Sequence, residues 1–321
     1  MEKDLSAVAG DTAHGNCVIG VDGGGTKTVA WLARRTPSGG FAVLGKGEAG
    51  PGNPRAAGFE PALENLGRAI LAAFSSASLH PGAVRSACLA LAGAGRESER
   101  TRIHEWACRQ RVASSVKVVN DAEPLLAAGT SSGWGVALIS GTGSLAYGRN
   151  AAGEVARVGG WGYLFGDEGS AYSVAVAGLR AAAHLADGRG RPTVLLERLL
   201  ARIGGGQVQR LVEVIYQEGF DRSSVAKLAT AVLEAADEGD AVSVDLLRQA
   251  ARELAVMVEV LSVRLRFVAD DLPLALAGSW LLGATLLQEL FLQELHARGI
   301  RPRIQRVSEP VAGAVQLACL G

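Results

Sequence analysis

The chain has 321 residues, of which 48% are hydrophobic, with 32 basic and 32 acidic side chains. This length and hydropathy allow the cores of two domains and exclude a disordered protein, while zero net charge gives no electrostatic basis for binding nucleic acid or an anionic membrane. The four cysteines are scattered in no metal-ligand pattern, which favours a reducing compartment.

The chain begins with sixteen polar residues that lack the apolar segment of a signal peptide, so we expect a cytoplasmic protein. Three strands are then predicted, at residues 18–21, 28–33 and 41–44. Helices and strands alternate after them, at 61–79, 86–91, 97–109, 116–119 and 123–128. This order predicts an α/β fold in which parallel pairing follows an antiparallel start.

The same pattern begins again after residue 133. Three further strands are predicted, at 134–139, 145–148 and 154–158. Helices fill much of 168–267, and the last expected elements are a strand at 272–277, a helix at 280–298, a strand at 304–307 and a helix at 311–320. The apolar stretch 272–287 contains Pro273 and two glycines, and it is too short for a membrane span. The repeat predicts two similar lobes facing a cleft, a preferred place for a small-molecule site.

The turn after the first strand, DGGGTK, has the composition of a phosphate-binding loop. Glycines tolerate positive φ and let backbone N–H groups approach an anion, and Thr26 adds a hydroxyl donor. Asp22, at the strand end, could hold a water of Mg²⁺. A plain hairpin turn explains this turn equally well when it is taken alone. The second turn, SGTGS at 140–144, strengthens the phosphate interpretation because it lies at the equivalent place in the repeat.

Asp121 follows the strand at 116–119, where open α/β sheets place their ligands. A carboxylate there could act as a general base toward a hydroxyl group. The alternative is a helix start in which Asn120 is the cap and Glu123 completes a capping-box-like pair.

Three other segments have both a structural and a functional interpretation. Asn53 in GPGNP is most simply a turn residue, and Asp167 in GDEGS is a possible cap of the following helix. The glycines at 159–162 and 166–169 also let side chains close on a polar ligand. The Gly278-Ser279 link between a strand and a helix could let a flat adenine approach the backbone.

In chain order, the segments DGGGTKT, VVNDA, LISGTGS, GGWGYLFGDEGSAY and ALAGSW resemble the N-acetylglucosamine kinase branch of the BadF/BadG/BcrA/BcrD ATPase family. That family is part of the actin-like, hexokinase and Hsp70 ATPase superfamily. The resemblance spans Val18 to Leu320. It implies two RNase H-like lobes, one of residues 1–126 with a carboxyl-terminal helix at 309–321 and one of residues 127–308, with ATP and sugar in the cleft between them.

The resemblance also implies a reaction, transfer of the ATP γ-phosphoryl group to the 6-hydroxyl of an amino sugar, with N-acetylglucosamine as the first expectation. Asp121 would be the general base and Asp22 the Mg²⁺ residue. The residues implied at ATP are Gly24, Gly25, Thr26, Lys27, Gly141, Thr142, Gly143, Ala226, Gly278, Ser279 and Gly283. Those implied at the sugar are Asn53, Asp121, Gly160, Trp161, Gly162 and Asp167. A homodimer is implied as well.

Several alternatives remain open from the sequence. Glucosamine or N-acetylmuramic acid could be the substrate. An ATPase activator of the same wider group would carry an iron–sulfur cluster on paired cysteines, which the scattered cysteines oppose. A sugar sensor without catalysis is opposed by Asp121 and by the two glycine turns. Ser279 departs from the superfamily, which often has a second glycine there, and the zinc-binding cysteines of the ROK sugar kinases are missing.

Overall fold

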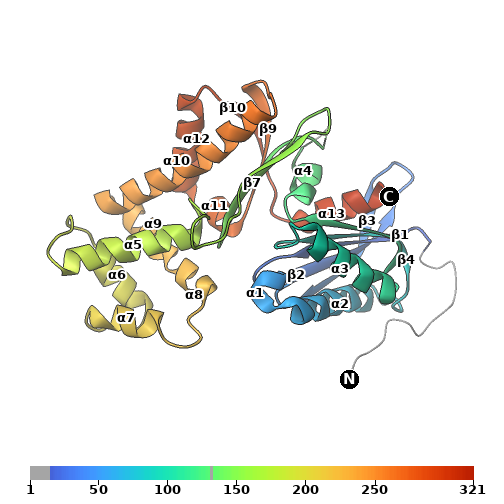
Figure 1. Cartoon of the computed structure of the whole chain (residues 1–321), viewed down its shortest axis with the longest axis horizontal. Helices are drawn as coiled ribbons and strands as arrows, with labels where there is room; N and C mark the ends of the chain where they lie inside the picture. Colours follow the sequence, from blue (N-terminus) through green and yellow to red (C-terminus); the bar gives the residue numbers. More distant parts are fainter. Residues whose placement is uncertain (1–14, 131–132) are drawn as a thin grey trace. The chain divides into compact units, whose positions relative to one another are not determined.

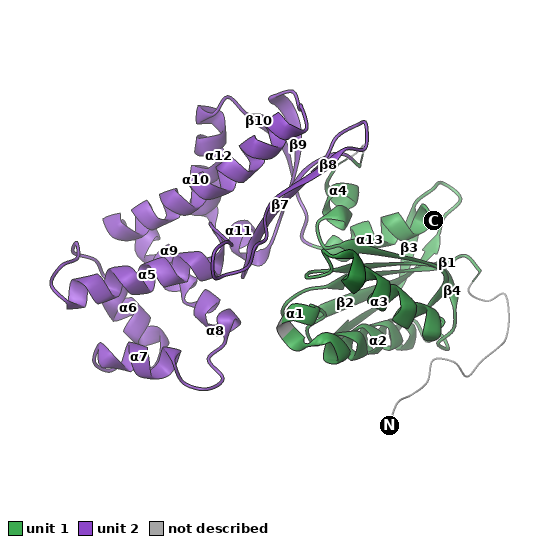
Figure 2. Ribbon diagram, viewed as in Figure 1, with its two compact units in different colours: residues 1–133, 309–321 green, residues 134–308 purple. Residues whose placement is uncertain are grey.

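The computed structural model describes residues 15–130 and 133–321, so the polar segment 1–14 lies outside it. The chain divides into two compact units, unit 1 of residues 1–133 with 309–321 and unit 2 of residues 134–308 (Figure 2). Both units combine helices with a five-stranded sheet, as predicted. Within the described ranges, no helix is long and apolar enough to cross a membrane.

Unit 1 is built on a sheet with the strand order β3-β2-β1-β4-β5 (Figure 1). Its strands are β1 (Cys17–Gly23), β2 (Thr28–Arg35), β3 (Phe41–Ala49), β4 (Val84–Leu91) and β5 (Ala113–Asn120). The first three strands are antiparallel, and β4 and β5 run parallel to β1, as the sequence predicts. The helices of this unit are α1 (Pro54–Ala57), α2 (Phe59–Ser76), α3 (Glu97–Arg109), α4 (Glu123–Gly129) and α13 (Pro310–Cys319).

The two faces of this sheet bury different helices because successive side chains of a strand point to opposite sides. Ile19 and Val21 of β1 share a core with α2 and α3, while Val18 packs with α13. Helix α13 lies directly on β1, since a Cβ added at Gly20 would be 2.4 Å from the backbone nitrogen of Val315. Helix α13 therefore completes the packing of unit 1. Helix α4, which crosses the predicted boundary at residue 126, belongs wholly to unit 1.

Unit 2 repeats this topology, with the strand order β10-β9-β6-β7-β8. Its strands are β6 (Gly135–Ser140), β7 (Ser144–Arg149), β8 (Val155–Gly159), β9 (Asp270–Ala277) and β10 (Arg301–Arg306). The internal duplication predicted from the sequence is thus confirmed. The helices are α5 (Ala171–Ala186), α6 (Leu195–Arg202), α7 (Gln209–Ile215), α8 (Arg222–Lys227), α9 (Ala229–Asp237), α10 (Ala241–Arg264), α11 (Ser279–Gly283) and α12 (Thr285–Ala297).

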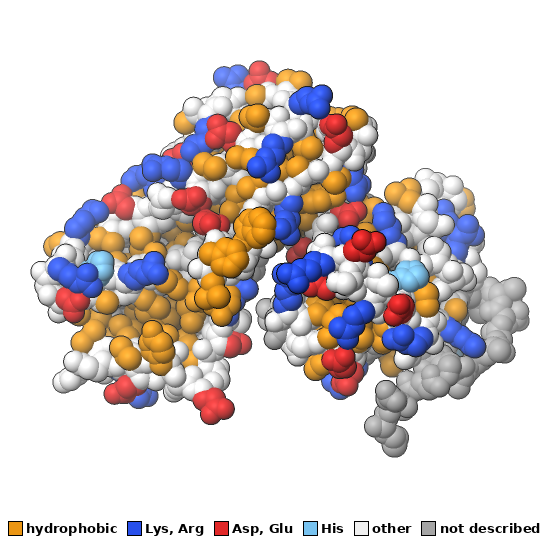
Figure 3. Space-filling view, viewed as in Figure 1, with side chains coloured by type: hydrophobic (Ala, Val, Ile, Leu, Met, Phe, Trp, Pro, Cys, Tyr) orange, Lys and Arg blue, Asp and Glu red, His pale blue; other side chains and the backbone are white. Residues whose placement is uncertain are grey.

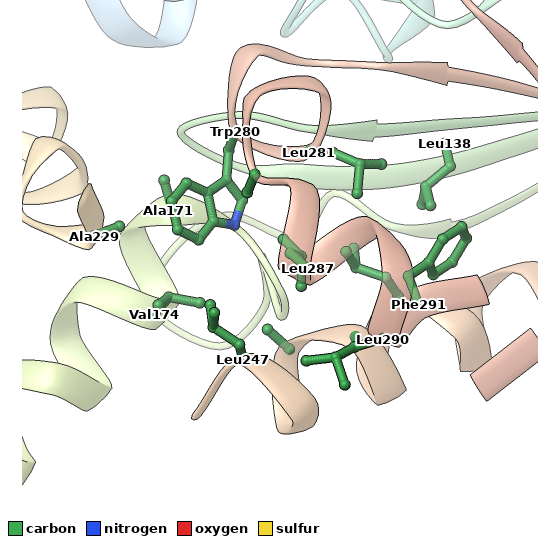
Figure 4. Close-up of a cluster of buried hydrophobic side chains, with 14 of the residues drawn as sticks. Leu138, Ala171, Val174, Ala229, Leu247, Trp280, Leu281, Leu287, Leu290 and Phe291 are labelled. Carbon is green, nitrogen blue, oxygen red and sulfur yellow. The ribbon is translucent and has the colours of Figure 1, made fainter. Parts of the chain in front are cut away.

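The sequence prediction is wrong for one element of unit 2. The helix expected at 280–298 is two helices, α11 and α12, because Ala284 between them has the non-helical angles φ −104° and ψ 89°. Gly283 immediately before the break weakens helical structure. The break lets both helices bury apolar side chains in one cluster, in which Trp280 of α11 lies beside Ala171 of α5, and Phe291 of α12 lies farther along the same cluster (Figure 4). This cluster anchors the turn at Gly278 that precedes α11.

The surface matches the zero net charge of the chain. On the face shown in Figure 3, basic and acidic side chains are interspersed, and neither sign forms a continuous field. Exposed ion pairs of this kind contribute little to stability individually, so the folded state depends mainly on the apolar cores.

The close approach at Gly278 gives a test of this packing. Gly278 has φ +96°, and a Cβ there would lie 2.2 Å from the carbonyl oxygen of Ser140. Gly239 has the similar φ of +91°, but its Cβ would meet no atom within 4 Å. We expect Gly239→Ala to lower the free energy of unfolding by about 1–2 kcal/mol through backbone strain alone. Gly278→Ala should cost about 3 kcal/mol or more, since the backbone must also move. Denaturant unfolding measures both, and equal losses would contradict the close approach.

Candidate functional site

In unit 1 the predicted site residues gather at one edge of the sheet. The parallel strands end in register, with Gly23 of β1 opposite Leu91 of β4 and Leu91 opposite Asn120 of β5. The glycine turn after β1 and the segment after β5 are therefore at the same edge. This is the edge where open parallel sheets bind ligands.

The glycine turn after β1 does not have the backbone conformation that the sequence suggests. None of its three glycines, Gly23 to Gly25, has a positive φ, so the expectation of left-handed backbone is wrong. A Cβ added at Gly25 would meet no atom within 4 Å, so there is open space at this position, whereas Cβ atoms at Gly23 and Gly24 would lie 3.1 Å from Leu91 and 3.3 Å from the Lys27 carbonyl oxygen. The turn is closed by the Gly24 N–H, which donates to the Lys27 carbonyl oxygen at 2.9 Å. Thr26 and Lys27 are exposed, and the Lys27 Nζ pairs with a Glu48 carboxylate oxygen at 3.2 Å.

Asn53 is a turn and capping residue, as its simpler interpretation predicts. Its Oδ1 accepts the Arg55 N–H at 2.9 Å at the start of α1. The Asn53 N–H donates to the Gly24 carbonyl oxygen at 3.1 Å, and the Gly52 N–H donates to the same oxygen at 3.0 Å. These two bonds hold Asn53 beside the glycine turn.

Asp121 is not required as a helix cap, because Asn120 performs that task. The Asn120 Oδ1 accepts the N–H groups of Ala122 and Glu123, each at 3.0 Å, and its Nδ2 donates to the Glu123 carboxylate. Asn120 thus accepts the first N–H groups of the helix, as the capping alternative predicts, although the cap position itself is Ala122 and the capping box is not formed. The Asp121 carboxylate takes no part in these bonds. Burial raises the pKa of Asp121, and a bond from its own backbone N–H opposes that rise.

Asp22 and Asp121 form a pair of partly buried carboxylates. Burial first, and then the neighbouring charge of Asp121, raise the pKa of Asp22 to about 7, while Lys27 opposes the shift. A bound divalent cation would offset both effects. Mg²⁺ takes oxygen ligands and usually keeps several waters alongside one or two carboxylates and substrate phosphates. The described residues contain no group of three or more His, Cys, Asp or Glu side chains suited to a metal ion. The pair therefore fits Mg²⁺ shared with a phosphate ligand.

In unit 2 the second small-residue turn is fixed by bonds to the start of α5. The Gly141 N–H donates to the Gly143 carbonyl oxygen at 2.9 Å, and the Gly141 carbonyl accepts the Ala171 N–H at 2.9 Å. The buried Ser140 hydroxyl donates to the Gly169 carbonyl oxygen at 3.0 Å. The half-buried peptide groups of residues 141–143 thus have a defined conformation.

Two of the segments expected at the nucleotide meet in unit 2. An ideal Cβ on Gly141 would lie 3.9 Å from both the Gly278 Cα and the Ser279 nitrogen. The other two expected residues differ in their surroundings. Gly283 is exposed at the end of α11, and the side chain of Ala226 is buried in α8.

Asp167 lies beneath the second turn with 4% of its surface exposed. Its Oδ1 accepts the Ser144 N–H at 3.2 Å, and its Oδ2 accepts a bond from the Arg222 Nη2 at 2.5 Å. The capping interpretation is wrong, because the cap of α5 is Ser170, whose Oγ accepts the Ser173 N–H. Sequence reasoning missed Arg222, which follows Asp167 by 55 positions in a region predicted only as helical. Nothing in the local sequence distinguishes it from other surface arginines.

The remaining residues expected at the sugar lie just after β8. The Gly160 N–H donates to the Ser144 carbonyl oxygen at 3.0 Å, which places this segment next to the second turn. Trp161 is 62% exposed, with the Arg157 guanidinium 5.2 Å from its ring centroid. Gly162 follows it in a left-handed conformation, and a Cβ there would meet no atom within 4 Å. An exposed indole of this kind can cover an apolar ligand face.

Comparisons with known proteins agree with these features. The model of the BadF/BadG/BcrA/BcrD ATPase family matches residues 19–318. The N-acetylmuramic acid/N-acetylglucosamine kinase of Clostridium acetobutylicum is 35% identical over 251 residues, which cover 77% of this chain and 81% of that protein. The N-acetyl-D-glucosamine kinase of Dictyostelium discoideum is 27% identical over 314 residues, with coverage of 94% and 97%.

A solved structure supports the fold. The crystal structure of a Chromobacterium violaceum protein proposed to be an N-acetylglucosamine kinase has a TM-score of 0.77. It is 24% identical, and the match covers 95% of this chain and 99% of that one. The two-lobe α/β fold class predicted from the sequence is confirmed by this likeness and by the repeated sheet topology.

The carboxylate pair predicts a pH-dependent stability. The pKa of Asp22 is about 7 in the folded chain and 3.8 ordinarily. Protonation of Asp22 therefore contributes stability that is fully present below about pH 4 and is lost as the pH rises through about 7. Asp22→Asn has no charge to bury, so without nucleotide and Mg²⁺ it should be more stable than the wild type at pH 8. The gain should be about 1–2 kcal/mol, less than the full shift implies because Asp22 keeps some solvent contact.

Thermal unfolding at pH 5, 6, 7 and 8 measures this difference. The matched control is Glu60→Gln, which removes a carboxylate from the exposed face of α2. The gain from Asp22→Asn should grow with pH, and the effect of Glu60→Gln should change little. A gain that is equal at pH 5 and pH 8 would show that the charge of Asp22 carries no folding cost.

Proposed function

The chain belongs to the BadF/BadG/BcrA/BcrD ATPase family, and from this premise we propose that it is an ATP-dependent amino-sugar kinase. The reaction is transfer of the γ-phosphoryl group to the sugar 6-hydroxyl. The observation that carries the proposal is the free role of Asp121: Asn120 caps the helix, so a partly buried carboxylate is left at the sheet edge beside an open glycine turn.

N-acetylglucosamine is the proposed substrate, since both curated relatives carry that sugar in their names. N-acetylmuramic acid is the second candidate, because it is also in the name of the relative that is 35% identical. The two sugars differ by a lactyl group at the 3-position. The proposal also includes Mg²⁺ and a homodimer, which the family resemblance implies, and a cytoplasmic location, which the scattered cysteines favour.

The proposed general base is Asp121, which would orient the sugar 6-hydroxyl and accept its proton. A base works best when its pKa is close to the working pH, and burial shifts the pKa of Asp121 in that direction. Asp22 would hold Mg²⁺ through oxygen, and the bound cation would neutralise charge on the phosphates. Phosphoryl transfer requires little more from a protein than positioning and charge stabilisation.

The two small-residue turns are proposed to bind the same ATP molecule. Thr26 and Thr142 would contact its phosphates through their hydroxyls, with the backbone N–H groups of Gly25 and Gly143. Gly24 and Gly141 would lie beside the phosphates, and their own N–H groups close the two turns. Lys27 would join them by leaving its exposed pair with Glu48, which is a weak interaction. Gly278 and Ser279 would lie at the adenosine, with Ala226 and Gly283 as neighbours.

Asn53, Trp161 and Asp167 are proposed to line the sugar together with Gly160 and Gly162. The Asp167 carboxylate has about four lone-pair directions and uses two of them for Ser144 and Arg222. It can therefore still accept hydrogen bonds from sugar hydroxyls. A site that is built to pair with hydroxyls discriminates strongly against analogues that lack them.

A coupled assay of ADP formation tests the proposed function directly. The purified protein is supplied with ATP and Mg²⁺ and with N-acetylglucosamine, N-acetylmuramic acid, glucosamine, N-acetylmannosamine or glucose. We expect ADP formation that depends on an N-acetylated amino sugar, with the highest kcat/KM for N-acetylglucosamine. ADP formation that no sugar stimulates would refute the kinase proposal.

Asp121→Asn keeps the size of the side chain and removes the proton acceptor. Its kcat should fall about 10²–10⁴-fold, the usual contribution of a general base, while nucleotide affinity changes little. The control is Glu123→Gln, which alters a carboxylate of the same segment that bonds Asn120. It should keep most of the activity. Near-normal turnover by Asp121→Asn would remove Asp121 from the role of base.

A further inference from the structure

Arg222 is a cation placed directly against the second turn of unit 2. It is the first residue of α8, a short helix that Asp221 caps. Its Nη2 donates to the Thr142 carbonyl oxygen at 3.2 Å and to the Asp167 Oδ2 at 2.5 Å. One guanidinium nitrogen thus joins the backbone of the turn to the carboxylate beneath it.

The pair of Arg222 and Asp167 occupies the place where a side chain at Gly143 would be. A Cβ added at Gly143 would lie 2.6 Å from the Arg222 Nη2 and 3.0 Å from each Asp167 carboxylate oxygen. The turn therefore rests on the ion pair without an intervening side chain. Any change in the charge or position of the pair acts directly on the peptide groups at 142–144.

Two tyrosines fix the orientation of the guanidinium. Its central carbon is 5.4 Å from the Tyr163 ring centroid and 5.8 Å from that of Tyr172, and the two rings meet edge to face. The Arg222 Nε is buried and has no hydrogen-bond partner among the described residues. The two tyrosine rings and the ion pair with Asp167 thus hold the Arg222 guanidinium, although its Nε donor makes no hydrogen bond among the described residues.

The ion pair matters because the turn is proposed to bind a polyanion. Asp167 is almost fully buried, and a bare carboxylate below the turn would repel a phosphate above it. Burial raises the pKa of Asp167, and the charge of Arg222 opposes this shift. Arg222 therefore stabilises the ionised form of the Asp167 carboxylate and balances its negative charge. The local charge beneath the turn is then close to zero.

We propose that Arg222 is a positioning residue of the ATP site, which neutralises Asp167 and holds it beneath the turn at 141–143 so that the turn accepts a triphosphate. This inference rests on the proposed function, because it takes the turn as a phosphate-binding element. Arg222 acts through Asp167 and the Thr142 carbonyl.

A double-mutant cycle tests the charge role. The probe is the Mg²⁺ complex of the non-hydrolysable analogue AMPPNP, titrated calorimetrically into the wild type, Arg222→Ala, Asp167→Asn and the double variant. Arg222→Ala leaves a buried, unpaired carboxylate and should weaken binding about 10–100-fold. Asp167→Asn removes that carboxylate and should weaken binding less than about fivefold. The double variant should bind clearly better than Arg222→Ala, because the repulsion is gone.

Two further variants separate charge from structure. Arg222→Lys keeps the charge without the planar fork and should fall between the wild type and Arg222→Ala. Arg202→Ala is the matched control, because Arg202 also joins a carboxylate, that of Glu234, to a second oxygen acceptor, the Thr230 Oγ1 at 2.9 Å. The two arginines are similarly exposed, 39% for Arg202 and 36% for Arg222. Arg202→Ala should bind AMPPNP like the wild type.

Failure of the inference differs from failure of the proposed function. Wild-type binding that Arg222→Ala leaves unchanged would overturn the inference alone. A double variant as weak as Arg222→Ala would overturn it too, because a purely structural role predicts no rescue. No AMPPNP binding by the wild type, together with no sugar-dependent ADP formation, would overturn both proposals.

Discussion

The candidate site is constrained by the burial of carboxylates at the ends of parallel strands and beside short glycine turns. Burying a carboxylate is unfavourable unless a partner compensates its charge. The repeated fold meets this constraint twice, and in different ways. In unit 1, Asp22 and Asp121 lie near one another, and their pKa values are raised. In unit 2, Asp167 has Arg222 as a direct partner. The pKa of Asp167 is raised as well, but the charge of Arg222 opposes that shift. The two units therefore differ in how directly a buried carboxylate is compensated.

This difference explains how a duplicated unit can serve two purposes. A pair of uncompensated carboxylates favours a cation, whereas a neutralised carboxylate permits an anion to approach. The turn after β1 ends a strand that carries Asp22, and the turn after β6 rests on a closed ion pair. Under the proposed function, unit 1 would receive a metal-bound phosphate and unit 2 a phosphate held by backbone N–H groups. The strand pattern sets where the turns lie, and a few charged side chains would then determine what each turn binds.

Sequence reasoning predicted the parts of the fold that follow from periodicity. Strand and helix alternation located every strand and the longer helices of unit 1, whereas residues 168–267 were predicted only as helical, without the bounds of α5 to α10. The repeat of strand, small-residue turn and strand identified both turns. Positive φ is not the reason for the glycines of the first turn, because none of them adopts it; Gly25 alone leaves open space, while Gly23 and Gly24 are closely packed. The break at Ala284 was missed because apolar residues on both sides continue a helical pattern. Tertiary burial of Trp280 and Phe291, which local pattern does not encode, favours two helices there.

The carboxylate partners show the limit of prediction more sharply. Asn120 and Asp121 are adjacent, so the question of which residue starts the helix and which is left for chemistry could be posed from the sequence. Two hydrogen bonds show that Asn120 binds the start of the helix, and the catalytic role of Asp121 stays a prediction. Asp167 and Arg222 are far apart in the chain, and only the packing of α8 against α5 brings them together. Charge compensation is a property of three-dimensional neighbours, whereas periodicity is a property of sequence neighbours. A glycine such as Gly143 connects the two, because its missing side chain marks the place where a distant ion pair must fit.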